Sequence, residues 1–133
     1  MAVVRQALTA PDAPAAVGPY SHAVLARDDG GEGLLFCSGQ IPLDPETGEL
    51  VGATAAAQAE RCLENLQAVC RAAGTTLGRA VRVTVYMTDL AAFAEVNDVY
   101  GSFFDDQPPA RVTIGVAQLP MGARVEIDAT VAL

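Results

Sequence analysis

The chain of 133 residues is acidic, with a formal net charge of −8, and 51% of its residues are hydrophobic while only 5% are aromatic. This length predicts one domain, residues 1–133, with an aliphatic core that buries roughly two thirds of the surface of the unfolded chain. The negative charge argues against binding to nucleic acid, and no apolar run approaches the roughly 18–20 residues of a membrane span.

The N-terminus and the cysteines indicate the cellular compartment. Residues 1–6 lack the basic and then apolar plan of a signal peptide. The three cysteines are an odd number and show no Cys-x-x-Cys spacing, which indicates free thiols in a reducing environment. Together these observations predict a cytoplasmic protein.

Three strands are expected in the first third of the chain. Val3 to Leu8 is a short strand that ends before Pro11. His22 to Arg27 and Leu34 to Ser38 form a predicted hairpin, because the glycine-rich segment 28–33 tolerates the positive φ of tight turns. The same segment could be a phosphate-binding loop, but it is acidic and no helix follows it, which favours the hairpin.

A long helix is expected from Thr54 to Ala73, because apolar residues recur there at three- and four-residue spacing. Thr54 suits the N-cap, and Gly74 suits the position after the last helical turn.

A strand and a second helix follow. The strand runs from Ala80 to Met87, with Val81, Val83, Val85 and Met87 expected on one face. Thr88 or Asp89 is expected to cap the helix. The predicted buried stripe of this helix consists of Phe93, Val96, Tyr100, Phe103 and Phe104.

The last two strands carry the charged residues on which the functional prediction depends. Two prolines block a helix before Arg111, and period-2 alternation after them puts Arg111 and Thr113 on one face. Residues 124–131 alternate in the same way and carry Glu126 and Asp128 on their polar face. A guanidinium and a carboxylate on one sheet suit a site for a small molecule that bears a carboxylate.

The expected order of elements is β-β-β-α-β-α-β-β, an α+β architecture. Two helices can cover only one face of such a sheet, yet residues 34–37 and 112–117 are apolar or small on both faces. A bare second face of this kind is usually an interface. The sequence therefore predicts a closed homo-oligomer.

Each candidate site residue also has a structural interpretation. Arg111 could clamp a carboxylate with two parallel N–H donors, or it could form a salt bridge with Glu126 or Asp128. Glu126 could orient or deprotonate a water molecule, or it could be a solvated strand residue. Thr113 could bind a ligand or simply suit a strand. The single histidine, His22, leaves no His–His metal site and is expected at a polar strand position.

Six spaced blocks of sequence carry a further signal. They are residues 18–21 (GPYS), 38–44 (SGQIPLD), 63–66 (LENL), 96–100 (VNDVY), 109–111 (PAR) and 119–127 (LPMGARVEI). In this order they resemble the RidA/YjgF family of enamine/imine deaminases, over nearly the whole chain.

The resemblance implies a chorismate-mutase-like α+β fold, with a six-stranded mixed sheet and two helices packed on one face. It also implies a homotrimer with ligand sites between its subunits. The implied reaction is hydrolysis of 2-enamino and 2-imino acids, such as 2-aminoacrylate and 2-iminobutanoate, to 2-keto acids and ammonia. The implied partners are these reactive small molecules, which connects the protein to metabolite damage control, and neither a metal nor an organic cofactor is expected.

By the same resemblance, Arg111 would bind the substrate carboxylate and Glu126 would activate or position water. Tyr20, Gly39 and Asn97 fall on positions that contact the substrate or line the cleft.

The chain departs from the family pattern at a few positions. Val112 stands where serine is frequent, and Thr113 stands where cysteine is frequent, so that a hydroxyl replaces a thiol as a hydrogen-bonding group. The loop from Asp28 to Gly33 is longer than usual, and His22 stands where glutamine is common.

Other functions fit the sequence less well. A non-catalytic small-carboxylate binder or protein-interaction module of the same fold is the main alternative, since binding alone would also use Arg111. Chorismate mutase activity would rest on shared fold alone. RNA cleavage, which has been attached to this family, suits an acidic chain with one histidine poorly.

Overall fold

The computed structural model describes residues 3–133, which form six strands, two α-helices and three short 3-10 turns. Residues 1–2, which belong to the segment expected to lack a signal peptide, lie outside this range. The strands are β1 (Val4–Leu8), β2 (Ala23–Arg27), β3 (Gly33–Gln40), β4 (Ala80–Met87), β5 (Ala110–Gly115) and β6 (Val125–Ala132). The helices are α1 (Ala55–Ala72) and α2 (Phe93–Gly101). The predicted order of elements is confirmed.

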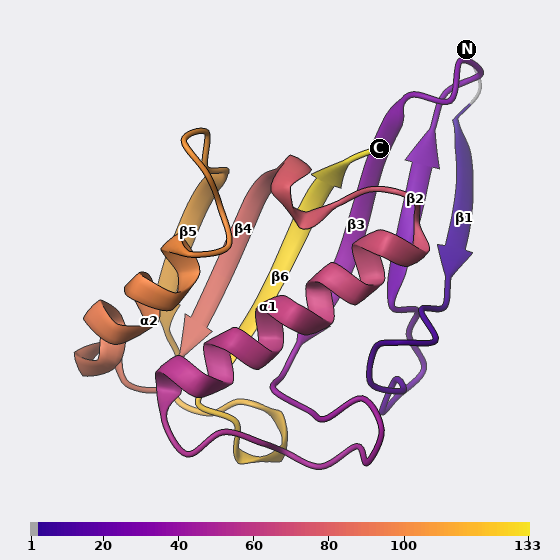
Figure 1. The fold of residues 1–133 in the computed structure, drawn as a ribbon. Helices are drawn as coiled ribbons and strands as arrows, with labels where there is room; N and C mark the ends of the chain where they lie inside the picture. Colours follow the sequence, from indigo (N-terminus) through magenta and orange to yellow (C-terminus); the bar gives the residue numbers. More distant parts are fainter. Residues whose placement is uncertain (1–2) are drawn as a thin grey trace.

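The strands form one mixed sheet in the order β1-β2-β3-β6-β4-β5. Strands β4 and β5 are parallel, and all other neighbours are antiparallel. Both helices pack on the same face, with α1 running across β3 and β6, and α2 beside α1 near β5 (Figure 1). The predicted α+β fold, with two helices on one face of a six-stranded sheet, is confirmed.

The ends of α1 form as the sequence predicts. The Thr54 side chain accepts a hydrogen bond from the backbone N–H of Ala57 at 3.1 Å, which satisfies a donor that the first helical turn leaves free. Gly74 has a φ of +81°, a left-handed conformation that stops the helix at little steric cost. Between these ends, the apolar stripe of α1 is fully buried against the sheet at Leu63, Leu66 and Val69.

Two predicted details of the next elements are wrong. Val81 is 46% exposed, because the pairing of β4 with β6 is irregular between Ala80 and Arg82 and breaks the alternation there. Phe93 is 39% exposed and is not part of a buried stripe. Asp89 caps a 3-10 turn, Leu90–Ala92, which precedes α2, and its carboxylate accepts from the N–H of Ala91 at 2.9 Å.

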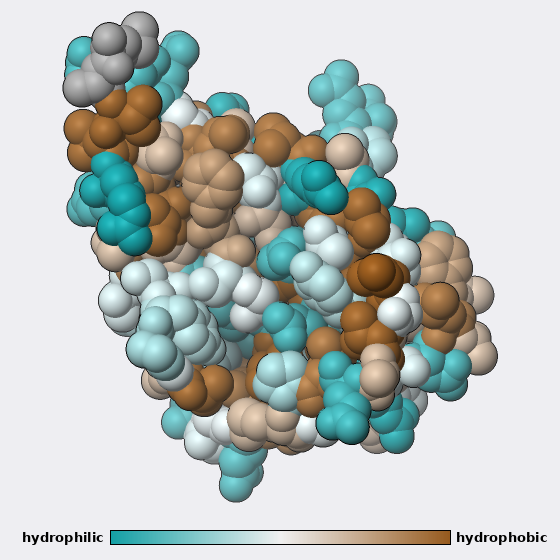
Figure 2. Space-filling view, turned by 180° about the vertical axis from the view of Figure 1, so that it is seen from behind, coloured by the Kyte–Doolittle hydropathy of each residue, from teal (hydrophilic) through white to brown (hydrophobic). Residues whose placement is uncertain are grey.

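The sheet face opposite the helices carries uncovered hydrophobic side chains (Figure 2). They include Leu34, Phe36, Val112 and Ile114, which are 36–48% exposed. The register places them away from the helices, since Val112 pairs with Thr84 while its neighbour Arg111 pairs with the buried Val83. The bare second face that the sequence predicts is therefore present; the homo-oligomer that would cover it stays a prediction.

Cys37, Cys62 and Cys70 are free thiols in the core, as predicted. No helix within residues 3–133 combines the length and the apolar character that crossing a membrane requires.

Candidate active site

Arg111 and Glu126 lie on opposite faces of the sheet. Arg111 pairs with Val83, which is buried under the helices, and its side chain contacts α2. Glu126 pairs with Tyr86 on the uncovered face, where the Tyr86 hydroxyl donates a hydrogen bond to Asp128 at 3.0 Å. Both groups rise from one sheet, as predicted, but a single chain does not bring them together.

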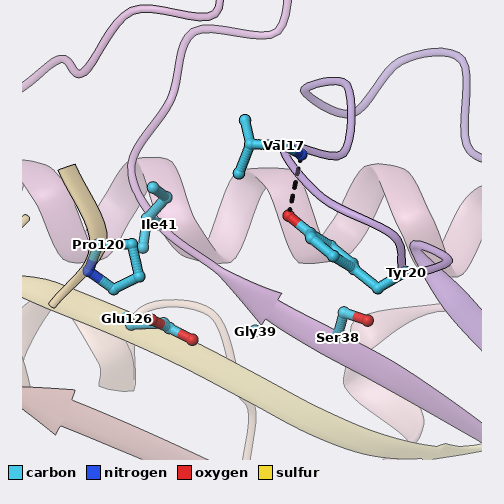
Figure 3. A pocket seen from close by; sticks show the side chains of 7 residues that line it. All are labelled: Val17, Tyr20, Ser38, Gly39, Ile41, Pro120 and Glu126. Atoms are coloured by element: carbon cyan, nitrogen blue, oxygen red, sulfur yellow. Dashed lines mark hydrogen bonds between the residues drawn. The ribbon is translucent and has the colours of Figure 1, made fainter.

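Glu126 lies in a pocket of about 330 Å³ on the uncovered face. The lining residues are Val17, Tyr20, Ser38, Gly39, Ile41, Pro120 and Glu126 (Figure 3). The Tyr20 hydroxyl oxygen accepts a hydrogen bond from the N–H of Val17 at 3.3 Å, which holds its ring along the pocket wall. The structure thus brings Tyr20 and Gly39 together with Glu126, while the rest of the lining is mostly apolar.

Gly39 is required by the position of Glu126. A Cβ atom at residue 39 would overlap with the Glu126 carboxylate, which extends from the neighbouring strand β6 toward the glycine (Figure 3). The pairing of β3 with β6 is also irregular between Cys37 and Gln40, so the two strands leave room for the Glu126 side chain at this point.

We expect Gly39→Ala to displace the Glu126 carboxylate and to lower the rate of a reaction that depends on it by about 10²-fold, because catalysis is sensitive to displacements of about 1 Å. Gly78→Ala is a matched control, since a Cβ there meets only the Thr76 hydroxyl at 3.7 Å. Steady-state kinetics of both variants would check this. Equal rates for the two variants would show that the position of Glu126 does not matter.

The pKa of Glu126 is raised by its burial and by the nearby negative charge of Asp128. A raised pKa brings the group closer to neutral pH, where it can both accept and return a proton. Asp128 itself accepts the Tyr86 hydrogen bond, and burial together with this bond raises the pKa of Tyr86. The Glu126 pocket therefore holds a carboxylate suited to proton transfer.

Arg111 lies in a second pocket, of about 480 Å³, on the helix side. The lining residues are Asn97, Tyr100, Gly101, Phe104, Asp105, Pro108, Pro109 and Arg111. Arg111 is exposed, and its Nη1 donates a hydrogen bond to Asn97 Oδ1 at 2.8 Å. Within residues 3–133 the only ion pair joins Arg61 and Glu64, so the predicted alternative of a salt bridge to Glu126 or Asp128 is wrong.

Two further predictions are refined by this geometry. Asn97 was predicted near the cleft, and the structure places its side-chain oxygen on the guanidinium of Arg111. Thr113 shares the sheet face of Arg111, since its partner Val85 is buried like Val83, but Thr113 lines neither of these two pockets.

His22 organises the loop that carries Tyr20, a role that sequence reasoning missed. Its side chain is buried: Nδ1 accepts from the N–H of Ala10 at 2.8 Å, and Nε2 donates to the carbonyl of Pro14 at 2.7 Å. The backbone donor at Ala10 fixes this tautomer. The predicted polar strand position is therefore wrong, because His22 lies just before β2 begins at Ala23 and its buried ring bonds to the preceding loop.

Asn65 supports the other side of the Glu126 pocket and was also missed as a functional position. It is fully buried on α1, and its side-chain amide donates to the carbonyls of Ile41 at 3.4 Å and Leu43 at 3.0 Å. Its oxygen accepts from Arg61 Nε at 3.1 Å. The sequence did offer a signal: Asn65 lies next to the apolar stripe of the predicted helix, and an amide buried there needs hydrogen-bond partners.

Comparisons with known proteins agree with this fold. The family model described as endoribonuclease L-PSP matches residues 10–133. The chain is 54% identical over 122 residues to the RutC family protein y4sK of Sinorhizobium fredii, covering 92% of this chain and 93% of that protein. It is 41% identical over 127 residues to a Bos taurus protein named 2-iminobutanoate/2-iminopropanoate deaminase, covering 96% of this chain and 89% of that protein.

A solved structure supports the same assignment. RidA from the Antarctic bacterium Psychrobacter sp. matches with a TM-score of 0.87 and 41% identity, covering 96% of this chain and 99% of that one. The chain therefore has the fold of the proteins that the endoribonuclease L-PSP family model describes. The chain belongs to the RidA/YjgF family.

Proposed function

We propose that the protein hydrolyses reactive 2-imino and 2-enamino acids, such as 2-iminobutanoate and 2-aminoacrylate, to 2-keto acids and ammonia. The observation that carries this proposal is an exposed arginine, free of any ion pair among the described residues, beside a pocket. A guanidinium in this state can bind a carboxylate with two parallel N–H donors. The deaminase name of the bovine relative supports the same reaction.

The opposite placement of Arg111 and Glu126 supports sites that form between subunits of a homotrimer. One small substrate cannot touch both groups within a single chain, because the sheet lies between them. The uncovered side chains of Phe36, Val112 and Ile114 offer an apolar surface for assembly. Strand β5, which carries Arg111, lies at the edge of the sheet, so a neighbouring subunit that presents this edge to the uncovered face would bring its own Arg111 toward the Glu126 pocket.

The proposed mechanism uses a guanidinium, a carboxylate and water. Arg111 binds the substrate carboxylate, which fixes the adjoining carbon next to Glu126 and makes the attack effectively unimolecular. Glu126 accepts a proton from water as the water oxygen adds to the protonated imine. Glu126 then returns the proton to nitrogen and, as the carbon–nitrogen bond breaks, accepts the proton of the newly added hydroxyl group. Ammonia and the 2-keto acid are released, and this last proton passes to solvent. A 2-enamino acid first takes a proton on carbon to become the imine.

Ammonia release from freshly generated 2-iminobutanoate, compared with buffer alone, tests the proposal. We expect clear acceleration by the protein. Release no faster than in buffer, together with retained binding of 2-oxobutanoate, would instead support the non-catalytic binder.

The structure does not favour RNA cleavage, although the family model is described as an endoribonuclease. The net charge of −8 opposes the approach of a phosphate backbone. The single histidine is buried, and both of its ring nitrogens already form hydrogen bonds.

We expect the acid limb of the pH–rate profile to report on Glu126. The reaction needs the ionised carboxylate, so the rate falls as the pH drops below the pKa of Glu126, which burial and Asp128 raise. Asp128→Asn removes one of these causes and still accepts the Tyr86 hydrogen bond, so the limb should move to lower pH. Profiles of kcat/KM for both proteins would check the shift, and a move to higher pH would contradict it.

A further inference from the structure

Three side chains of α2 contact the guanidinium of Arg111. Phe93, Asn97 and Tyr100 are four and three residues apart, so they share one face of the helix. The Arg111 Cζ lies 4.6 Å from the centroid of the Tyr100 ring and 5.6 Å from that of Phe93. Arg111 also donates the 2.8 Å hydrogen bond to Asn97. Two aromatic rings and one hydrogen-bond acceptor therefore contact the guanidinium.

Tyr100 contributes its ring and not its hydroxyl. The residue is only 6% exposed, and the hydroxyl oxygen is buried with no hydrogen-bond partner among residues 3–133. The ring nevertheless forms part of the wall of the Arg111 pocket. A buried hydroxyl that is closed off from solvent cannot donate a proton to a substrate, whereas the ring can stack on the guanidinium.

Fixing Arg111 before substrate arrives has a clear physical advantage. A free arginine side chain samples many rotamers, and ordering it on binding can weaken affinity by up to about 30-fold. The contacts from α2 order the guanidinium in advance. They use no carboxylate, so the positive charge stays available for a ligand.

We propose that Tyr100 is a positioning residue, which holds the Arg111 guanidinium through the face of its ring while its hydroxyl plays no part. The kinetic part of this inference rests on the proposed deaminase function. The binding part does not, because any small carboxylate bound by Arg111 would report on the same contacts.

The test compares Tyr100→Phe, which keeps the ring, with Tyr100→Leu, which removes it. The measurements are the Kd of 2-oxobutanoate by calorimetry and the KM and kcat for 2-iminobutanoate. We expect Tyr100→Phe to stay within about twofold of the wild type and Tyr100→Leu to raise Kd and KM about five- to tenfold, with a smaller change in kcat. Phe103→Leu is a control, since Phe103 packs against the core and no stacking contact joins it to Arg111 within the described chain.

Each outcome of these measurements either supports or overturns the proposed role of Tyr100. Equal losses in Tyr100→Phe and Tyr100→Leu would show that the hydroxyl acts, and unchanged Kd in Tyr100→Leu would show that the ring does not position Arg111; either result overturns the proposal. If Tyr100→Leu does not fold, Tyr100→Met removes the ring with a larger and more flexible side chain, and we expect the same five- to tenfold rise in Kd. An unchanged Kd in Tyr100→Met would then overturn the proposal. If the wild type binds 2-oxobutanoate but releases no ammonia, the proposed function fails while the Kd comparison still decides this inference.

Discussion

Arg111→Ala should abolish measurable acceleration of imine hydrolysis while leaving the fold and the oligomer intact. The side chain is exposed on the edge strand β5, so we expect its removal to change the free energy of unfolding by no more than about 1 kcal/mol. The substrate carboxylate would lose two charge-assisted hydrogen bonds, each contributing about 1.5–3 kcal/mol. The expected loss in kcat/KM is therefore at least about 10²-fold.

Arg111→Lys is the informative control for this prediction. It keeps the positive charge but loses the planar pair of donors and the stacking on Tyr100 and Phe93. We expect activity between those of the wild type and the alanine variant. Thermal melting and light scattering would confirm that each variant is folded and assembled. Turnover like that of the wild type in Arg111→Ala would assign carboxylate recognition to another residue.

The sequence was informative wherever a pattern is local. Period-2 alternation correctly divided each of the last two strands into an apolar and a polar face, and capping residues correctly marked the ends of α1 at Thr54 and Gly74. Alternation does not, however, relate the face of one strand to that of another. Arg111 and Glu126 lie on opposite faces because β4 lies between their strands and its register sets both pairings.

The remaining errors concern contacts that no local pattern encodes. His22 bonds to the carbonyl of Pro14 and the amide of Ala10, so its burial depends on how the loop folds back. Val81 is exposed because of an irregular pairing with β6, a strand more than 40 residues later in the chain. Asn97 could be named from the resemblance, but its hydrogen bond to Arg111 required the packing of α2 beside β5.

Glu126→Gln should retain binding of 2-oxobutanoate and lose about 10²–10⁴-fold in kcat, because the amide cannot accept the proton from water. Its pocket partners Tyr20 and Gly39 remain in place, so the shape of the site is kept. Kinetics and calorimetry on the purified variant would check both parts. A kcat close to that of the wild type would remove Glu126 from the mechanism.

The same variant can reveal whether sites form between subunits. If Arg111 of one subunit acts with Glu126 of its neighbour, mixing Arg111→Ala chains with Glu126→Gln chains rebuilds intact sites, although each variant alone is inactive. In randomly mixed trimers about a quarter of the sites combine both native side chains, so about a quarter of the wild-type activity should return. A chain carrying both substitutions, mixed with either variant, is the control and should restore nothing. Since the sheet separates the two residues within one chain, a mixture no more active than its components would mean that they never share a substrate.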